Sequence, residues 1–351
     1  MGLESPAGDD ALGRGDLADV AENVRRWLAF VPDSPLYRSL SHGVMGDDDL
    51  LRIVGRIPNV PPMNLLFGAV KFLVREDDAL AAWYPHLAGA ARPPDDEAYG
   101  AFRSFVLDRA EEVATIGRER RTQTNEVARS AVVLPWLADA ARGWGQAPHA
   151  LDIGASAGLN LCIESFEYRY GDHVVGESPV VIECENRGMF EVPDRLPRFA
   201  SRTGLDLSPV DVADPAETAW LEALVWPEHV GRLARLRAAI EVRRNADVTM
   251  VAGDATETLL EVERSLPPGP LLAWHTVAVY QFSADQREAL DAAFAEIATR
   301  REVVRVGLEP LPNQTGHWVS VGLASGAARI VAHAHSHGRW IDLPSRDEDP
   351  L

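Results

Sequence analysis

The stretch HALDIGASAGLNL, residues 149–161, decides the fold. An apolar run ends at Asp152, and Gly154 and Gly158 follow among small residues before a second apolar run begins. A short apolar run bounded by glycines is typical of a buried strand that turns into a helix. In open α/β sheets, ligands bind beyond the carboxyl ends of the strands, where such turns lie. The stretch therefore predicts the first strand of a parallel sheet, with a binding loop at its end.

The spacing of apolar residues differs between the sequences before and after this stretch. Helical periodicity predominates from about residue 16 to residue 145, whereas short apolar runs alternate with helical stretches after residue 149. That alternation indicates strands joined by helical crossovers. The last two β-rich runs, HWVSVGL and ARIVAHAHSHGRWIDL, predict a hairpin. We therefore expect an α/β fold, with an N-terminal all-helical domain at 1–145 and a mostly parallel sheet at 146–351 that ends in an antiparallel hairpin.

Charge narrows the classes of function. The chain has 351 residues and a formal net charge of −19. A surface this negative repels phosphate backbones, so we expect a small-molecule ligand and no nucleic-acid partner. The arginines of residues 232–244 are spaced as on a solvated helix face, which we favour over a binding stripe.

The expected location follows from three features. The chain contains no apolar run long enough to span a membrane, its N-terminal residues lack a signal-peptide pattern, and it has 2 cysteines, Cys162 and Cys184. Two cysteines are too few for a disulfide framework and suit a reducing compartment. We therefore expect a cytoplasmic protein with no membrane association, and the sequence leaves the oligomeric state open.

The loop after the first expected strand suits an anion or a nucleotide. Glycines let the backbone approach a ligand, and the free N–H groups at the start of a helix attract a carboxylate or a phosphate. Ser156 stands where a dinucleotide-binding loop commonly has its middle glycine. A glycine-rich turn that serves packing alone stays open as the alternative.

This segment resembles the acidic-x-G-x-G-x-G motif of class I S-adenosylmethionine-dependent methyltransferases. The resemblance implies a Rossmann-like methyltransferase sheet and S-adenosylmethionine as the cofactor. It also implies that the acidic residue and the loop surround the cofactor's amino-acid end. The candidates for this part of the site are Asp152, Gly154, Ala155, Ser156, Gly158 and Asn160.

Two later segments resemble the next strands of that family. RTGLDLS resembles the second strand, which implies that Asp206, followed by Leu207, binds the ribose hydroxyls. VTMVAGDATE resembles the third strand, which implies that Gly253, Asp254 and Ala255 lie near the adenine.

The spacing departs from the family pattern. The ribose acid is expected about 20 residues beyond the glycine loop, and Asp206 lies about 50 residues beyond it. We expect an inserted hairpin or lid at about 165–200 to account for the difference. Glu183, at the end of the run PVVIE, is the alternative ribose ligand, and the order of the segments favours Asp206.

The chain as a whole resembles an uncharacterised, mainly actinobacterial family, domain of unknown function 2332. The segments that carry this resemblance are RRTQTNEVARSAVVLP, LDIGASAGLNL, GLDLSPVDVADP, WLEALVWPEHVGRLARLRAAI and WHTVAVYQF. The resemblance implies the two-part architecture above and no established reaction.

Candidate catalytic residues follow the fourth expected strand. PLLAWHTVAVYQF resembles that strand of the methyltransferases, which implies that His275 and Tyr280 line the acceptor pocket. A histidine there suits a general base, because its ordinary pKa lies near neutrality, and a pocket wall is the alternative. Aromatic faces attract a sulfonium, so Tyr168, Tyr170 and Tyr280 are candidates. An exposed aromatic pair on a hairpin is the alternative for Tyr168 and Tyr170.

The segment RTQTNEV, residues 121–127, gathers polar side chains at the start of a helix. Helix capping explains some of them. The surplus of amide and carboxylate groups supports another interpretation, in which Gln123, Asn125 and Glu126 face the cofactor or the substrate. Asn125 is the catalytic candidate among them, and the helical domain then forms a substrate pocket or lid.

The segment AHAHSHG places His333, His335 and His337 at alternate positions, which share one face of a regular strand. Three imidazoles suit a metal ion, but neighbours on one strand cannot by themselves close a tetrahedral site. We therefore expect a hairpin surface and no metal.

Three hypotheses about function remain. The first is an S-adenosylmethionine-dependent methyltransferase that acts on a small-molecule acceptor. The second is an enzyme that transfers or cyclises the aminocarboxypropyl group of the same cofactor and releases methylthioadenosine. The third is a non-catalytic nucleoside-binding protein that keeps the fold. A nicotinamide-dependent dehydrogenase is disfavoured by Ser156 and by the acidic residue before Gly154.

Overall fold

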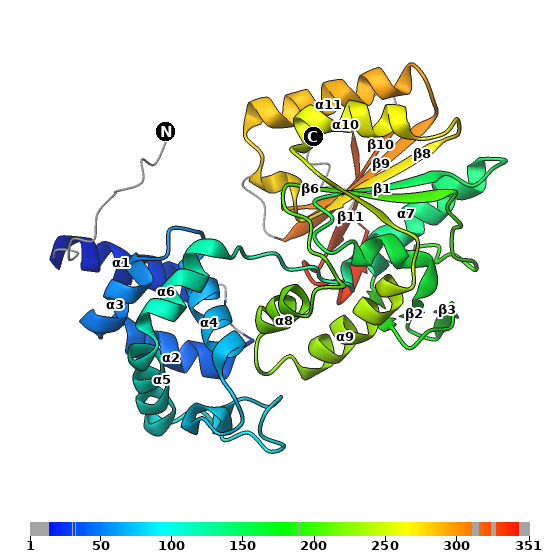
Figure 1. The fold of residues 1–351 in the computed structure, drawn as a ribbon. Helices are drawn as coiled ribbons and strands as arrows, with labels where there is room; N and C mark the ends of the chain where they lie inside the picture. The colour runs from blue at the N-terminus through cyan, green and yellow to red at the C-terminus, as the bar shows by residue number, and fades with distance from the viewer. Residues whose placement is uncertain are drawn as a thin grey trace. The chain divides into compact units, whose positions relative to one another are not determined.

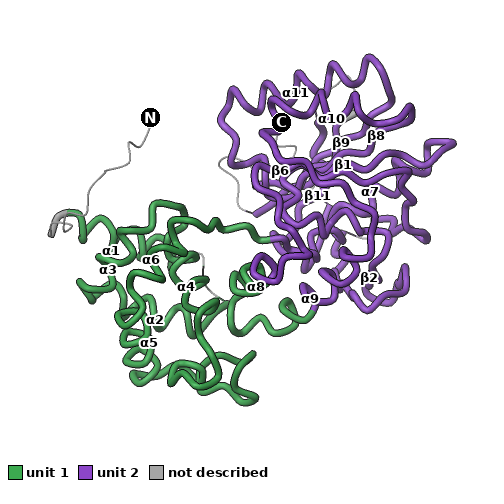
Figure 2. Tube along the Cα trace, viewed as in Figure 1, with its two compact units in different colours: residues 1–124, 219–234 green, residues 125–218, 235–351 purple. Residues whose placement is uncertain are grey.

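The computed structural model describes residues 14–29, 31, 33–188, 190–310, 316–323 and 328–343. The chain forms two compact units (Figure 2). Unit 1 contains residues 1–124 and 219–234, and unit 2 contains residues 125–218 and 235–351. This division differs from the expected boundary at residue 145, because the segment after residue 124 belongs to unit 2 and a later segment returns to unit 1.

The described part of unit 1 contains helices and no strand. These are α1 (Arg14–Leu28), α2 (Pro35–Met45), α3 (Asp48–Gly55), α4 (Pro62–Leu73), η1 (Ala79–Trp83), α5 (Asp96–Asp108) and α6 (Ala110–Glu119). Local sequence sets their starts, since Asp47 caps α3 by accepting the N–H groups of Asp49 and Leu50. Aromatic rings fill the core, where Tyr37 stacks on Phe67 with 4.1 Å between ring centroids.

Residues 219–234 complete the core of unit 1. Trp220, in α8 (Pro215–Ala223), is 2% exposed and belongs to this core. The buried ammonium group of Lys71 donates to the carbonyl oxygens of Glu222 and Val225 near the end of α8. Glu228 accepts hydrogen bonds from Ser34 Oγ (2.6 Å) and from a backbone N–H in the first turn of α2 (2.8 Å). The later segment therefore supplies both apolar area and helix caps to unit 1.

Unit 2 is built on a sheet. Within the described residues its nine strands run in the order β5-β12-β11-β10-β9-β8-β1-β6-β7. Their bounds are β1 His149–Ile153, β5 Glu185–Asn186, β6 Ser201–Asp206, β7 Thr249–Ala252, β8 Leu271–Thr276, β9 Val303–Glu309, β10 His317–Leu323, β11 Arg329–Ala334 and β12 Trp340–Asp342. The five strands from β9 to β7 pair in parallel, and β9, β10, β11 and β12 pair antiparallel in sequence. The prediction of an α/β fold with a large, mostly parallel sheet is confirmed.

Helices cover the sheet, and strand alternation decides which side chains they meet. On one face, α10 (Ala255–Ser265) and α11 (Ala284–Ala298) pack over Leu151 and Ile153 of β1 (Figure 1). Because side chains alternate along a strand, Ala150 and Asp152 point to the opposite face. Helix α7 (Arg129–Gly143) packs against β8 and β9. Helix α9 (Val230–Arg244) precedes β7.

The segment between β1 and β6 contains a second, smaller sheet, in the region of the expected insertion. After η2 (Leu159–Ser165), strands β2 (Glu167–Tyr170), β3 (His173–Val175) and β4 (Val181–Glu183) form a three-stranded sheet in the order β3-β2-β4. β2 and β3 form an antiparallel hairpin, and β4 pairs with β2 in parallel.

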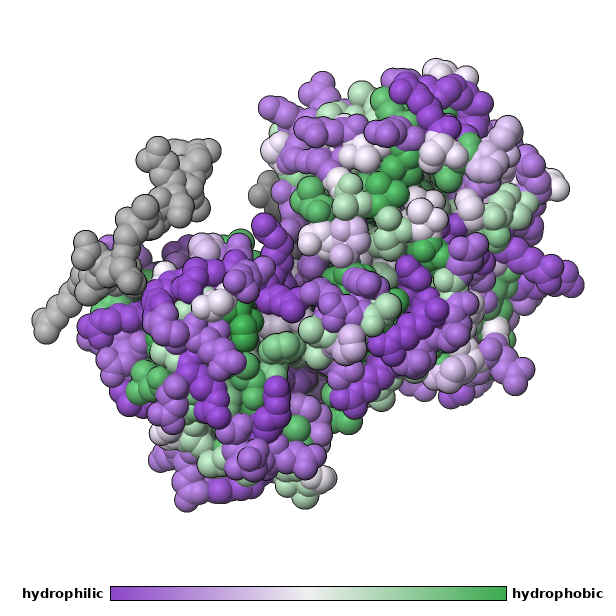
Figure 3. Space-filling model, viewed as in Figure 1, coloured by the Kyte–Doolittle hydropathy of each residue, from purple (hydrophilic) through white to green (hydrophobic). Residues whose placement is uncertain are grey.

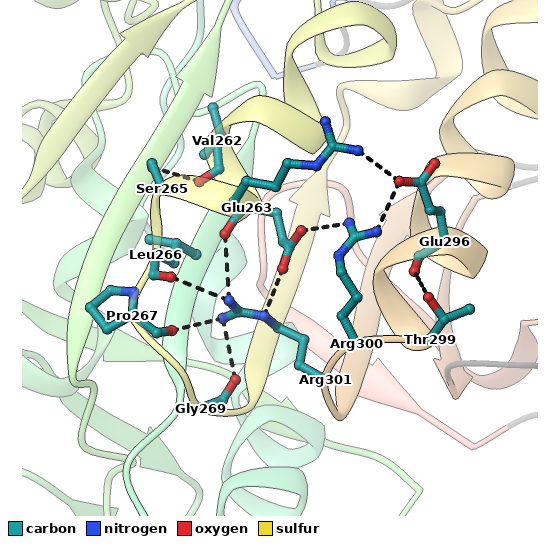
Figure 4. A network of polar contacts seen from close by, with 11 residues as sticks. Val262, Glu263, Ser265, Leu266, Pro267, Gly269, Glu296, Thr299, Arg300 and Arg301 are labelled. Carbon is teal, nitrogen blue, oxygen red and sulfur yellow. Dashed lines mark hydrogen bonds and ion pairs between the residues drawn. The ribbon is translucent and has the colours of Figure 1, made fainter.

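An ion-pair network joins α10 to the end of α11 (Figure 4). The Glu263 side chain is 2% exposed and pairs with Arg300 at 2.7 Å and with Arg301 at 2.8 Å. Arg301 also donates to backbone carbonyl oxygens that follow α10, those of Leu266, Pro267 and Gly269. These bonds give partners to the carbonyl groups of the C-cap residue Leu266 and of the turn that follows it.

Polar residues cover most of the face of each unit that Figure 3 shows, in agreement with the charged composition of the chain. Among the described residues, no helix combines the length and the apolar character that crossing a membrane requires.

Candidate functional site

The candidate site lies at the carboxyl ends of β1, β6 and β8. β1 pairs with β6 on one side and with β8 on the other, and the chain order of the parallel strands reverses at β1. In open α/β sheets, a crevice forms at this switch point and ligands bind there. The loop that follows β1 has three residues with positive φ: Gly154 (76°), Ser156 (53°) and Gly158 (69°).

Ser156 holds a conformation that costs a residue with a Cβ atom about 1–2 kcal/mol. Its backbone N–H donates to Asp206 Oδ2 at 2.8 Å, which fixes the loop against the end of β6. Val277, which directly follows β8, has a φ of 56°. Positive φ is rarer still for a β-branched residue. Two strained residues therefore flank the switch point, as is common at functional sites.

The two glycines of the loop have a packing reason. A Cβ atom on Gly154 would collide with Ala278 Cβ, and one on Gly158 would lie 2.8 Å from Met250 Sδ and 3.1 Å from Arg243 Nε. The protein's own side chains thus occupy the space that the glycines leave. The expected role of Gly154 and Gly158 as points of ligand approach is not needed to explain them.

Asp152 is the buried carboxyl group of the site. It is 2% exposed, and its Oδ1 atom has no hydrogen-bond partner among the described residues. Burial raises the pKa of Asp152 well above its ordinary value, and the nearby charge of Asp206 raises it further. The Trp274 side chain, whose Nε1–H is itself without a well-aligned acceptor among the described residues, acts on this pKa as a weak hydrogen-bond donor and lowers it, as does the positive charge of Arg129. The raised pKa favours the protonated form of Asp152, and a cation beside it would favour the carboxylate.

Two further buried oxygen atoms of the same segment are also unsatisfied within the described structure. These are Ser156 Oγ and Asn160 Oδ1. Buried polar atoms nearly always have a partner, so a group of such atoms needs an explanation. Ala155, which directly precedes Ser156, is fully buried and contributes no polar side chain.

Arg129 is a residue of this site that sequence reasoning missed. It starts α7, is buried, and donates from Nε to the carbonyl oxygen of Ser336 (2.9 Å) and from Nη1 to that of Thr276 (3.2 Å). It thereby binds the carboxyl end of β8 to the turn after β11. The available signal was a lone arginine in the apolar run ARSAVVLPWL.

The polar segment before α7 is divided between the units. Asn125 Oδ1 accepts the backbone N–H of Leu159 at 3.1 Å, which places Asn125 against the loop after β1. Glu126 is buried, accepts the N–H of Ala128 at 3.1 Å and lies 3.5 Å from an Arg235 nitrogen. Gln123 belongs to unit 1. The structure thus brings Asn125 to the candidate site through a capping contact.

The two candidates for a ribose acid lie in different sheets. Asp206 ends β6, and its two carboxylate oxygens accept N–H bonds from Ser156 and from Ser208 (2.9 Å). The Glu183 side chain is 79% exposed in β4, 4.0 Å from Arg169. Since β4 is not a strand of the large sheet, the geometry favours Asp206 over Glu183.

The expected adenine segment follows β7 and starts α10. Asp254 caps that helix by accepting the Thr256 hydroxyl at 2.7 Å and the Thr256 N–H at 2.8 Å. These two hydrogen bonds lower the pKa of Asp254. A Cβ atom on Gly253 would collide with the Thr258 side chain. Ala255 belongs to the core beneath α10, whereas Leu207, after β6, is exposed.

His275 forms a buried pair with Glu309, a residue that the sequence did not single out. His275 Nδ1 and Glu309 Oε1 are 2.7 Å apart. Glu309, the last residue of β9, also accepts the backbone N–H groups of Ala278, Val279 and Tyr280 at 3.1 Å. Burial alone would raise the pKa of Glu309, but the hydrogen bonds from His275 and from the backbone outweigh it and lower the pKa. Such a carboxylate fixes the tautomer in which Nδ1 carries the proton and Nε2 accepts one.

The aromatic candidates are divided by burial. Tyr168 and Tyr170 are buried in β2, and their hydroxyl groups donate to the carbonyl oxygens of Ile163 (2.8 Å) and Ala131 (2.6 Å). The alternative of an exposed aromatic pair is therefore wrong, and sulfonium binding by these rings stays a prediction. Tyr280, in η3 (Val279–Gln281), is half exposed.

The three C-terminal histidines do not share one regular strand. β11 ends at Ala334, so His335 and His337 lie in the turn that follows, while His333 stacks on Trp318 with 4.6 Å between ring centroids. Within the ranges that the structure describes, no group of three or more His, Cys, Asp or Glu side chains is placed to hold a metal ion.

A protein-family model matches residues 28–343. The chain belongs to the DUF2332 family. The family is described as an uncharacterized protein conserved in bacteria, so membership in it does not indicate which reaction, if any, the chain catalyses. No curated protein matches the chain.

Proposed function

We propose that the chain is an S-adenosylmethionine-dependent methyltransferase acting on a small-molecule acceptor. The observation that carries the proposal is the unsatisfied Oδ1 atom of Asp152, buried at the carboxyl end of β1. Together with Asn160 Oδ1, the site has two acceptor atoms that lack a donor within the described structure. An ammonium group has three N–H donors and no acceptor, so the amino-acid end of this cofactor fits that need.

The strand order supports the proposal. Numbered in chain order, the five parallel strands run 3-2-1-4-5 across the sheet, as in doubly wound nucleotide-binding folds. In those folds the crevice at strand 1 holds the ligand, and Asp152, Ser156 and Asp206 stand at or just beyond the ends of the corresponding strands β1 and β6. The antiparallel strand β10 directly follows β9, without the helical crossover that a sixth parallel strand would need.

The chain's own residues would divide the work as follows. Asp152 and Asn160 would hold the ammonium group, and Asp206 would accept the ribose hydroxyls. When bound, the cofactor supplies an electrophilic methyl group. Methyl transfer then depends chiefly on alignment of the acceptor with that group. His275 would take the acceptor's proton on Nε2, because Glu309 holds the Nδ1 side of the ring.

Isothermal titration tests the proposal directly. Wild-type protein should bind S-adenosylmethionine and S-adenosylhomocysteine, and Asp206→Ala should weaken both by about tenfold or more, since bonds to a charged group contribute about 1.5–3 kcal/mol. Asp247→Asn, at an exposed position, is the matched control and should bind as wild type. Absence of binding to either compound at millimolar concentration would remove the proposal.

A second readout tests Asp152 itself. A carboxyl group whose pKa is raised in the free protein loses its proton when an ammonium group binds beside it. Titrations in two buffers with different ionisation enthalpies should therefore show proton release on binding, and Asp152→Asn should abolish that release. Equal proton release in the variant would place the ammonium group elsewhere.

Analysis of the spent cofactor then separates the reactions. S-adenosylhomocysteine as the product supports methyl transfer, whereas methylthioadenosine supports transfer or cyclisation of the aminocarboxypropyl group. Tight binding with unchanged cofactor after incubation with cell extract supports a nucleoside-binding protein without catalysis.

A further inference from the structure

Unit 2 contains a cavity of about 610 Å³ at the amino-terminal edge of its sheet. It lies between the last turns of α7, the residues just before β1 and the segment 191–198 that leads to β6. Pro148, which lines it, directly precedes β1, whereas the Asp152 loop follows the other end of that strand. Cavities of roughly 300–1,000 Å³ hold small molecules. This cavity is therefore of ligand size and distinct from the candidate site.

The wall of the cavity combines flat apolar surface with arginines. Its apolar part comes from Trp144, from alanines at the end of α7, and from proline and leucine side chains. Trp144 is partly exposed, so its indole ring is open to contact from the cavity side. A planar apolar group suits such a wall, because rings stack on indole and on guanidinium planes.

The charges in the wall do not balance. Glu191 lies 3.5 Å from Arg142, and Asp194 lies 4.0 Å from the imidazole of His173. Arg195 and Arg198 are exposed and have no ion-pair or hydrogen-bond partner in the part of the chain that the structure describes. The wall contains three arginines, Arg142, Arg195 and Arg198, and two carboxylates, Glu191 and Asp194, so it has one excess positive charge in a chain with a net charge of −19.

One feature of the cavity opposes an anion. The carbonyl end of α7 points toward it, and a helix C-terminus carries roughly half a negative charge. Two guanidinium groups carry two full positive charges, and each can bind a carboxylate or a phosphate through two parallel N–H bonds. The positive groups therefore outweigh the helix end.

We propose that this cavity is a second binding site, for a small anion with a flat apolar body. The anionic group would bind Arg195 and Arg198, and the flat body would stack on Trp144. An aryl phosphate and an aryl carboxylate share this chemistry.

The test uses the full-length protein and simple probes. Phenyl phosphate, inorganic phosphate, benzoate and phenol are titrated while tryptophan fluorescence and heat are recorded. Phenyl phosphate and benzoate should bind more tightly than inorganic phosphate or phenol, because each combines a charge with a ring. The tighter of the two identifies the preferred anionic group.

Variants locate the site. The double variant Arg195→Ala/Arg198→Ala should weaken phenyl phosphate binding at least tenfold, and Trp144→Phe should remove most of the fluorescence change. Arg287→Ala, an exposed arginine on α11 without a partner in the described structure, is the matched control and should leave binding unchanged. Equal affinity in the double variant would overturn the proposal.

A measurement on the unaltered protein keeps the test independent of folding in the variants. Phenyltrimethylammonium has the same ring and the opposite charge. It should not compete with phenyl phosphate, and affinity for phenyl phosphate should fall as salt is added. Tighter binding of the cation than of the anion would contradict the assignment.

Discussion

At the scale of single residues, Asp152 sets a pH dependence of stability. Its pKa is raised in the folded protein, so the folded state binds its proton more tightly than the unfolded state does. The stabilisation is complete below the ordinary Asp pKa of about 3.9 and is lost as pH rises through the folded-state pKa. We predict that Asp152→Asn is more stable than the wild type at pH 8, by about 1.4 kcal/mol for each unit of pKa shift, and that the difference shrinks toward pH 4.

Urea unfolding of both proteins at several pH values checks this prediction. Asp247→Asn changes an exposed carboxylate and should show no such trend. A loss of stability in Asp152→Asn that is equal at every pH would mean that the carboxylate is charged and paired in the folded state.

The pKa of Glu309 shifts in the opposite direction from that of Asp152. Its pKa is lowered in the folded protein, so its contribution is present above the ordinary Glu pKa and is lost as pH falls through the folded-state value. Glu309→Gln breaks a buried pair with His275 and weakens three backbone bonds, and should lower the free energy of unfolding at pH 7 by about 3 kcal/mol. The deficit should narrow on acidification.

Chemical denaturation and His275 imidazole nitrogen shifts test the Glu309 prediction together. The wild type should show a single pattern of nitrogen shifts, with Nδ1 in the hydrogen bond to Glu309, and the variant a mixture of tautomers. Glu261→Gln, exposed on α10, is the control for replacing a carboxylate by an amide. A variant as stable as the wild type would show that the pair contributes no net stability.

At the scale of elements, the Glu263 network joins two helices. Glu263→Ala would leave the largely buried Arg301 guanidinium without its carboxylate, whereas Arg300 would keep its pair with Glu296. We predict a loss of about 3–5 kcal/mol in thermal or urea unfolding. Arg264→Ala, next to Glu263 on α10, removes an exposed pair with Glu296 of α11 and should cost about 0–1 kcal/mol. Equal losses in the two variants would refute this contrast.

How much of the fold the sequence predicts depends on which contacts decide each element. β1 and β8 are apolar runs between breakers, so local pattern suffices for them. β5 and β12 have two and three residues, and their parallel pairing depends on chain segments far apart in sequence. No local signal of that length distinguishes a strand from a loop.

The candidate site shows the same limit. Asp152 and Asp206 became candidates because their segments resemble the first two strands of class I methyltransferases. Glu309 and Arg129 were missed, because their roles depend on strand register and on where α7 packs. Tyr168 was expected at a surface or a ligand, and burial of its ring follows from packing that the sequence pattern does not contain.

At the scale of the whole molecule, unit 1 is discontinuous in sequence. Its core contains Trp220, and the caps formed by Lys71 and Glu228 join residues from both of its segments. We predict that a fragment of residues 1–124 does not form the native helical unit. Circular dichroism and amide exchange of the fragment, with and without a peptide of residues 215–235, check this. Slow amide exchange in the fragment alone would contradict the prediction.

The change from helical periodicity to alternating apolar runs predicts one boundary at residue 145. Helix α8 begins in unit 2 and ends in unit 1, and α9 begins in unit 1 and ends in unit 2. The sequence pattern therefore stays helical across both changes of unit. Periodicity indicates that a segment is helical but not which elements it packs against. It therefore gives no sign that residues 219–234 belong to unit 1.

The discontinuity of unit 1 has a consequence for synthesis. A ribosome releases residues 1–124 well before residues 219–234, and at about 5–20 residues per second the delay is on the order of 5–20 s. During that interval the apolar side chains that later pack around Trp220 are exposed to solvent. A nascent chain stalled just after residue 124 should therefore be a good substrate for chaperones, and one stalled with residue 234 outside the exit tunnel a poorer one.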